Sequence, residues 1–354
     1  MTVRMTSGGL RRTRKGGRHV FDGYNRGISV WLGVVVLGTC LVSGCSERQQ
    51  AIDLYLDAVR LRELGQDEPA VRKLTTVVRQ APDFVLAYSE LGKAHLALNK
   101  PELAVEAFRK ATELNPWSFQ NYMDLAQVCR DLGRFGEAAR AFARAGDLDT
   151  ESLTAQLGAA QCYLHAGQPA RAVGHAESAR RMDPQSQEVL RLLADAYEQQ
   201  KDYEQAAQVY QELRQGDPAN LDLALALVRA CIRSEQYERA KGVLLEVVHS
   251  RPDHGAAFRD LGYCLLKLGD ADQAIAMYKK AVALDDGDWE AYRGLGVACM
   301  VKAQQTGDDA WQSAALRHWR RALAIYPDQP RRDWLEKLIR ESASTTNPLR
   351  GLND

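Results

Sequence analysis

Prolines recur on a 34-residue grid, and this period constrains the fold more than any other feature of the 354-residue sequence. Five slots of the grid hold proline, namely Pro82, Pro116, Pro184, Pro218 and Pro252. The two empty slots hold Thr150 and Asp286, residues that also suit turns or helix starts. A fixed period of this length predicts a solenoid or a propeller built from one repeated supersecondary unit.

Alignment on the grid divides the chain into eight repeats: 51–84, 85–118, 119–152, 153–186, 187–220, 221–254, 255–288 and 289–329. Pro327 lies 75 residues after Pro252, so the eighth repeat contains a seven-residue insertion. Twelve residues before every slot stands alanine: Ala70, Ala104, Ala138, Ala172, Ala206, Ala240, Ala274 and Ala315. A small side chain at a fixed position lets two helices approach to about 8–10 Å.

A second pattern follows each alanine. Four residues later the chain has, in most repeats, a large apolar residue, as at Phe108, Tyr278 and Trp319, and three residues after that a smaller one. Turn signals such as Leu132-Gly133-Arg134 separate the two halves of a repeat. Each repeat is therefore expected to be helix, turn, helix.

The spacing of alanine, large residue, small residue and proline over residues 51–329 resembles the tetratricopeptide repeat family. The resemblance implies an all-α fold, an α-solenoid wound as a right-handed superhelix of about eight helix-turn-helix repeats. Residues 330–341 place Trp334, Leu335, Leu338 and Ile339 on one face, which predicts a C-terminal capping helix. A flexible tail is expected over 342–354. The insertion around residues 302–311 either lengthens the two helices of repeat eight or forms a longer loop.

The N-terminus is typical of an export signal, because a basic region precedes an apolar run from Ile28 to Val42 and then Ser43, Gly44 and Cys45. The run of about 15 residues is shorter than the roughly 20 that span a bilayer. Residues 41–45 resemble the lipobox of bacterial lipoproteins. This implies a signal peptide over 1–44, lipid on Cys45 and a short tether over 45–50.

An uncleaved signal anchor is the alternative to lipidation at Cys45, and both interpretations place the repeats outside the cytoplasm. We therefore expect a location in the cell envelope, on the periplasmic side of a membrane. Ser46 after the cysteine resembles the pattern that favours the outer membrane in two-membrane bacteria.

The distribution of charge argues against nucleic acid as a partner. Residues 1–44 hold seven basic side chains and one acidic one, which leaves 39 basic and 45 acidic residues for the rest of the chain. Binding to nucleic acid depends on clustered lysine and arginine that neutralise phosphates. A mildly acidic body with dispersed charge has no such cluster.

The sequence contains no pattern typical of an active site, a cofactor or a metal ion. No CxxC, Walker-type, GxGxxG or GxSxG motif occurs. The histidines are not spaced as ligands on one helix face. Five cysteines fall at neighbouring positions late in first helices, where a small buried side chain packs: Cys129, Cys162, Cys231, Cys264 and Cys299. We therefore expect a protein that is not an enzyme and that uses no cofactor.

The expected binding surface comes from the resemblance, since first helices of this family line a concave face on which partner peptides lie. Carrying that pattern over gives six candidates: Arg191, Asp195, Arg229, Arg259, Tyr263 and Arg293. An arginine fork binds carboxylates, so an acidic segment of another protein is the expected ligand. The alternative is that Asp195, Glu290 and Asp222 neutralise arginines on their own helices.

Two functions remain. The first is a membrane-tethered adaptor or scaffold of the cell envelope that binds segments of other proteins in the concave face. The second is an accessory or substrate-delivery subunit for the export of envelope polysaccharide or protein.

Overall fold

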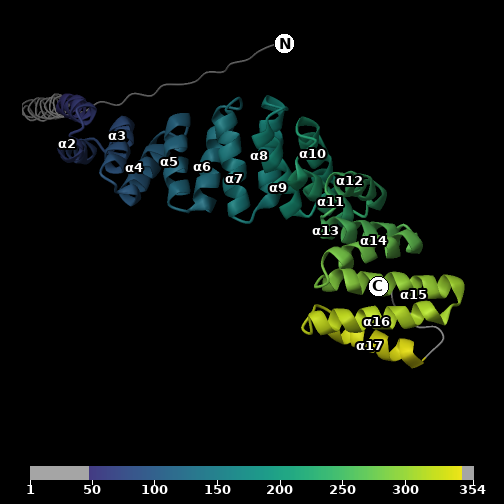
Figure 1. Cartoon of the computed structure of the whole chain (residues 1–354). Coiled ribbons are helices and arrows are strands. Elements are labelled where there is room, and N and C mark those ends of the chain that lie inside the picture. Colours follow the sequence, from purple (N-terminus) through teal and green to yellow (C-terminus); the bar gives the residue numbers. More distant parts are fainter. Residues whose placement is uncertain (1–47, 345–354) are drawn as a thin grey trace, which may run out of the picture. The chain divides into compact units, whose positions relative to one another are not determined.

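The computed structural model describes residues 48–344, whose regular secondary structure is entirely helical (Figure 1). The chain falls into two compact units, one ending at Leu114 and the other beginning at Asn115. The first unit contains a helical segment over residues 48–63, α2 (Asp67–Gln80), α3 (Val85–Ala97) and α4 (Pro101–Leu114). Its core includes Leu74 and Val77, both fully buried.

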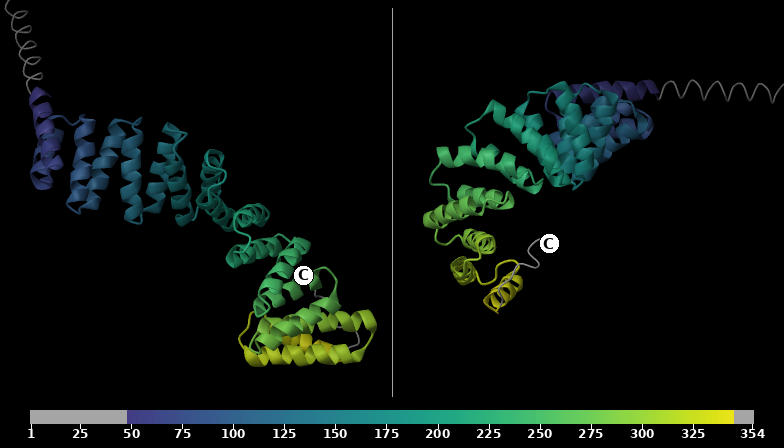
Figure 2. Two further views of the ribbon diagram at one scale, coloured as in Figure 1. Left: turned by 45° about the horizontal axis from the view of Figure 1, so that its top comes forward. Right: turned by 90° about the vertical axis from the view of Figure 1, so that its right-hand side faces the viewer.

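The second unit contains α5 to α17. Figure 2 shows how these helices follow one another in chain order. They are α5 (Phe119–Asp131), α6 (Phe135–Leu148), α7 (Leu153–His165), α8 (Pro169–Met182), α9 (Gln187–Gln200), α10 (Tyr203–Gly216), α11 (Leu221–Arg233), α12 (Tyr237–Ser250), α13 (Gly255–Lys267), α14 (Ala271–Leu284), α15 (Trp289–Thr306), α16 (Asp309–Ile325) and α17 (Arg332–Ser344).

Side chains at the repeat boundaries cap the N-terminus of the first helix of most pairs. A polar side chain just before the helix accepts a hydrogen bond from the backbone N–H three residues on, at Ser118, Ser152, Ser186, Asn220, His254 and Asp288. Such a cap satisfies one of the free N–H groups of the first turn and contributes about 1 kcal/mol. At Gly133, Gly167 and Gly269 the backbone between the two helices is left-handed, which glycine adopts without strain.

The regularly placed alanines lie at the centre of the packing. All eight, from Ala70 to Ala315, have no exposed surface. The large residues beside them fill the space against small residues of neighbouring first helices: a Cβ on Gly92 would lie 2.7 Å from the Phe108 ring, and one on Gly158 would lie 2.8 Å from the Phe142 ring. The regular spacing of alanines and large residues in the sequence therefore marks the positions where helices contact one another.

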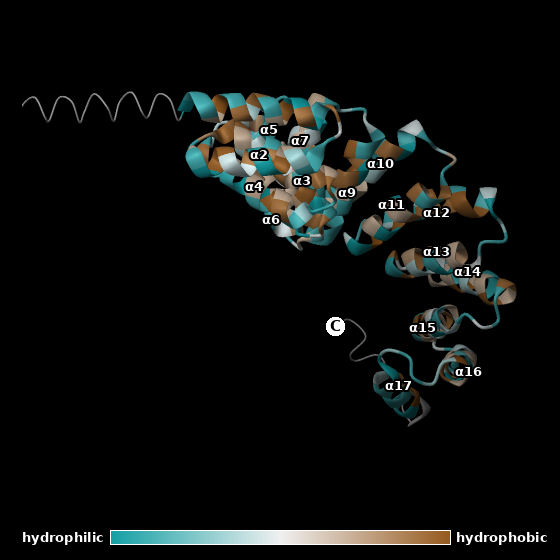
Figure 3. Cartoon of the chain, turned by 90° about the vertical axis from the view of Figure 1, so that its left-hand side faces the viewer, coloured by the Kyte–Doolittle hydropathy of each residue, from teal (hydrophilic) through white to brown (hydrophobic). Residues whose placement is uncertain are grey.

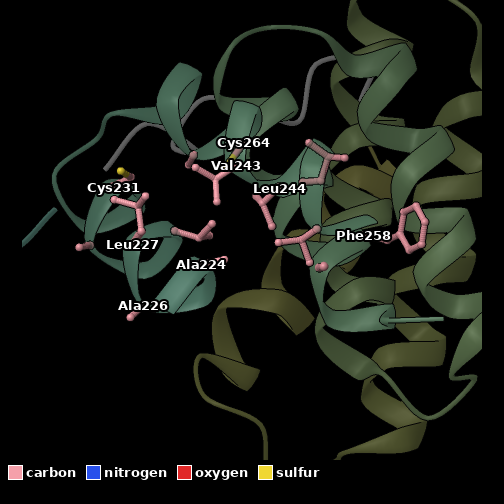
Figure 4. Packing of buried hydrophobic residues seen from close by; sticks show 14 of the residues in the cluster. Ala224, Ala226, Leu227, Cys231, Val243, Leu244, Phe258 and Cys264 are labelled. Carbon is pink, nitrogen blue, oxygen red and sulfur yellow. The ribbon is translucent and has the colours of Figure 1, made fainter. Parts of the chain in front are cut away.

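Within each unit, each helix packs against the next, and first helices of the second unit also contact one another, as α7 contacts α9 and α13 contacts α15. Hydrophobic and hydrophilic residues alternate around the helices, as the colouring of Figure 3 shows. Figure 4 shows Leu227, Val243 and Leu244 filling the space between helices of the second unit. The expected all-α array of antiparallel helix pairs is thus confirmed.

The insertion lengthens both helices of the eighth pair. α15 has 18 residues and α16 has 17, against 13 and 14 for α13 and α14. The two long helices pack along each other, and Trp319 on α16 is fully buried with its indole N–H donating to the Arg293 carbonyl at 3.2 Å. α17 then packs on α16 and buries Leu335 and Leu338.

The predicted signal peptide and the lipidation site at Cys45 lie outside the described residues. Between residues 48 and 344, no helix is both long enough and apolar enough to cross a bilayer.

Candidate functional site

The first helices α11, α13 and α15 each present a row of side chains spaced four residues apart. Residues at this spacing lie one above another on the same helix face. The rows are Arg229 and Arg233 on α11, Arg259, Tyr263 and Lys267 on α13, and Arg293, Val297 and Val301 on α15. Because these helices occupy equivalent places in successive pairs, their rows face the same side of the second unit.

The three rows line one cavity of about 940 Å³, with Arg331 and Trp334 at the start of α17 completing the wall. We call this space the cationic cavity. Four of the six residues predicted from the sequence line it, namely Arg229, Arg259, Tyr263 and Arg293. The other two, Arg191 and Asp195, lie exposed on α9 and do not line it.

Arg259 is held by carboxylates of its own and the following pair. Its Nη1 lies 3.1 Å from Asp288 Oδ2 and 3.2 Å from Glu290 Oε2, and its Nε lies 3.5 Å from Asp260 Oδ1. Burial opposes the charged form, but the three carboxylates outweigh burial and raise the pKa of the Arg259 guanidinium. Asp288 also caps α15 by accepting the Ala291 N–H at 2.9 Å. The positive charge of Arg259 is therefore neutralised by carboxylates of the protein itself.

The other five cations of the cavity form no ion pair with any residue between 48 and 344. They are Arg229, Arg233, Lys267, Arg293 and Arg331. Three of them lie over aromatic rings instead: Arg233 over Tyr203, Lys267 over Tyr263 and Arg293 over Trp289, with the last at 4.8 Å from the ring centroid. Only Asp260 and Glu290 among the lining residues are acidic, and both contact Arg259.

Arg293 is the least solvated of the five unpaired cations. It is half-buried, and burial lowers the pKa of its guanidinium. Glu290 raises that pKa, while the nearby positive charge of Arg331 lowers it. Burial and the repulsion of a second cation both disfavour the charged form of Arg293. A negatively charged group of a ligand would therefore stabilise it.

The cavity also has an apolar part. Val297 and Val301 from α15 contribute to it, together with Ile232, Leu266 and the ring of Trp334. Tyr278 forms part of the floor and is buried at 2% exposure. This ring needs Gly294 beside it, because a Cβ there would lie 2.5 Å from Tyr278 Cε1. The cavity thus offers unpaired positive charge around an apolar floor.

Sequence reasoning missed two kinds of cavity residue. Arg233 and Lys267 lie one turn beyond Arg229 and Tyr263, so extending the four-residue spacing would have found them. Arg331 and Trp334 follow the last repeat and have no equivalent in the other repeats, so the period gives no signal for them.

The pairs suggested within single helices do not form in the described range. No ion pair joins Arg191 to Asp195, Arg293 to Glu290 or Arg229 to Asp222. Desolvation and the negative charge of Glu198 raise the pKa of the Asp195 carboxyl, and Arg191 opposes them. The arginine that is neutralised is Arg259, by Asp260 and Asp288 of its own repeat and by Glu290 of the next one.

Five cysteines between residues 48 and 344 are buried, as predicted, and carry free thiols: Cys129, Cys162, Cys231, Cys264 and Cys299. Burial raises the pKa of the Cys162 and Cys299 thiols to about 11 and that of Cys264 to about 12. Such thiols are poor nucleophiles and poor metal ligands. Among residues 48–344, no cluster of histidine, cysteine, aspartate or glutamate could hold a metal ion.

Comparison with protein families agrees with this architecture. Models described as "Tetratricopeptide repeat" match residues 85–116, 123–186, 166–220, 197–262 and 260–288. The chain belongs to the tetratricopeptide repeat family. Proteins of this family are protein–protein interaction scaffolds that bind peptides and proteins and are typically not catalytic.

Two curated relatives are named Superkiller complex protein 3. The one from Mus musculus is 35% identical over 74 residues and the one from Homo sapiens is 34% identical over 74 residues. These matches cover 21% of this tetratricopeptide repeat chain but only 5% of each relative. The chain therefore corresponds to a small part of those proteins.

Solved structures of other proteins are also similar to this chain. The structure of "Naa15/Naa10 bound to HypK-THB" has a TM-score of 0.58 and 19% identity, and the match covers 84% of this chain and 44% of that one. YrrB, described as "a TPR protein with an unusual peptide-binding site", has a TM-score of 0.43 and 21% identity over 56% of this chain and 99% of that one. The first likeness shows a shared fold.

Proposed function

We propose that this tetratricopeptide repeat protein is a membrane-tethered adaptor of the bacterial cell envelope that binds acidic segments of partner proteins in the cationic cavity. One observation carries the choice of site. Five of the six cations of the cavity have no carboxylate partner in the described part of the chain, and they surround an apolar floor.

The size and charge of the cavity favour a polypeptide segment over a small ion. A volume of about 940 Å³ is far larger than one carboxylate needs, and it lies within the range typical of ligand sites. Arginine forks bind carboxylates through paired hydrogen bonds, and lysine adds a mobile positive charge. Valine, isoleucine and leucine between these cations offer contact to apolar side chains.

The proposed tether is a lipid on Cys45. Each buried methylene of an acyl chain contributes about 0.8 kcal/mol, and two or more chains hold a protein stably at a membrane. The short segment that follows would keep the repeats close to one membrane surface. Periplasmic exposure, with the outer membrane favoured by Ser46, belongs to the same proposal.

Charge reversal tests the site without touching the core. Arg229→Glu with Lys267→Glu changes two exposed, unpaired cavity cations. Arg140→Glu with Arg251→Glu makes the same change of net charge at exposed positions that do not line the cavity. Circular dichroism should show both variants folded like the wild type.

The assay is capture of partners from gently extracted envelopes, quantified by mass spectrometry. The proposal expects a reproducible partner set that the cavity variant loses and the control variant keeps. Equal capture by the wild type and the cavity variant would contradict the site. Capture of glycan or of any unfolded chain, without a defined partner set, would favour the delivery-subunit alternative instead.

The tether has its own test. In wild-type cells, mass spectrometry should find an N-terminal fragment that begins at a lipidated Cys45, and Cys45→Ala should release the repeats from the membrane fraction. An unmodified N-terminus that retains residues 1–44 would refute the lipid anchor while leaving the binding site intact.

A further inference from the structure

Part of the wall of the cationic cavity comes from the segment that follows the last repeat. Arg331 and Trp334 belong to the turn before α17 and to its first turn. Both line the cavity together with the rows of α11, α13 and α15. With Pro330, they are the residues through which a segment outside the repeats reaches the binding surface.

The backbone holds Arg331 in an unusual conformation. Its φ is +63°, in the left-handed region that residues other than glycine rarely adopt. The Arg331 carbonyl accepts the Leu335 N–H at 3.0 Å, and Leu335 is buried at 1% exposure, so the packing of α17 fixes this conformation. Strain of this kind persists where the surrounding structure holds it, and it is enriched at binding sites.

Charge also accumulates at this wall without compensation. Arg331 forms no ion pair with a residue of the described range, and it lies near enough to Arg293 to lower the pKa of that guanidinium. Trp334 is half-buried: part of its ring packs on the core of the second unit, and part lines the cavity. The cation of Arg331 and the ring of Trp334, three residues apart in sequence, therefore both line the cavity.

We infer that Arg331 and Trp334 select the partner segment, and that this segment is an extended acidic stretch carrying a large apolar side chain. Arg331 with Arg293 receives a carboxylate, and Trp334 with Val297 and Val301 receives the apolar side chain. Side chains two residues apart in an extended chain point the same way, about 7 Å apart, so alternate acidic residues can reach separate cations of the cavity. This inference rests on the proposed function, since it names the chemistry of the ligand for the same cavity.

The test uses three labelled peptides of equal length on a glycine–serine background. The first has glutamate at alternate positions and one central phenylalanine, the second has alanine in place of the phenylalanine, and the third has glutamine in place of every glutamate. Fluorescence anisotropy gives the affinity of the full-length protein for each. The wild type should prefer the first peptide to the second about tenfold, the effect expected for burying one large apolar side chain. The third peptide should bind least.

Two variants separate selection from folding. Arg331→Gly removes the side chain at a position whose backbone suits glycine, and Trp334→Leu keeps an apolar contact with the core but removes the ring. Lys337→Gln is the matched control, since it removes a positive charge from an exposed position of α17 that does not line the cavity. Arg331→Gly should weaken binding of the first peptide about tenfold. Trp334→Leu should abolish the preference for phenylalanine, and Lys337→Gln should change neither.

The outcomes also distinguish this inference from the proposed function. If Arg229→Glu with Lys267→Glu abolishes binding while Arg331→Gly and Trp334→Leu bind all peptides like the wild type, the cavity binds acidic segments and the selective role of α17 is wrong. If no cavity variant changes binding, both proposals fail. Equal affinity for the first two peptides and for dextran sulfate would show general attraction of polyanions and would overturn the inference.

Discussion

Replacing Arg259 with glutamine should destabilise the second unit by about 2 kcal/mol, even though Arg259 lies on the candidate binding surface. The Asp288 side chain is only 8% exposed, and the mutation leaves it with the Ala291 N–H as its remaining hydrogen bond. A hydrogen bond to a charged group contributes about 1.5–3 kcal/mol, and a buried acceptor left without its partner costs a similar amount. The α13–α15 contact should therefore weaken.

The assay is urea unfolding followed by far-UV circular dichroism, with Arg229→Gln as the matched variant. Arg229 is exposed and unpaired in the described range, so its loss should change the free energy of unfolding by less than about 0.5 kcal/mol. Because repeat arrays can unfold in segments, hydrogen exchange should locate the loss in α13 and α15. Equal stability of the two variants would refute the assignment of Arg259 to an internal network.

Three further predictions follow from the packing and the site. Gly296→Ala should destabilise the protein by about 1–3 kcal/mol, because the new Cβ would overlap the Trp319 ring, whereas Gly242→Ala, with open space around it in α12, should stabilise by up to about 1 kcal/mol; urea unfolding measures both. The five buried thiols should not react with Ellman's reagent in the native protein at about pH 8 and should all react after unfolding, because burial shields them and raises the pKa of Cys162, Cys231, Cys264 and Cys299; fast reaction of one of these five thiols, located by peptide mapping, would contradict this. Arg191→Glu should leave affinity for the acidic peptide within about twofold, since Arg191 does not line the cavity, and a tenfold loss by anisotropy would show that the site extends to α9.

The fold was predictable because its constraints repeat. A position that must be small in one repeat must be small in all of them. Ala70 and Ala315 therefore indicate the same helix contact, and both are fully buried. A single alanine would have carried no information. The insertion in the eighth repeat could not be placed from the sequence, because a period says nothing about residues outside it. Its helical state follows from the long contact between α15 and α16.

The site was predictable only in part, because some of its residues follow the repeat and others do not. The resemblance to the repeat family placed Arg229, Arg259 and Arg293 on one concave face, and all three line the cavity. Their charge states were not predictable, because the partners of Arg259 come mainly from the boundary and first turn of the next repeat. Asp288 is a helix cap by its sequence position, and its second role as a counterion depends on the distance between α13 and α15.

Stability and binding depend on different positions of the same helices. On α15, Gly294 and Gly296 face large rings of neighbouring helices, and neither can gain a methyl group without displacing a ring. Arg293 and Val297, each next to one of these glycines in sequence, face the cavity and meet no such limit on volume. Substitutions of Arg293, Val297 and the exposed cavity residues can therefore change the ligand at little cost in stability, provided that they spare Gly294, Tyr278, Arg259 and the carboxylates of Arg259. This separation makes the charge-reversal variants informative, because a loss of binding can be measured in a protein that is still folded.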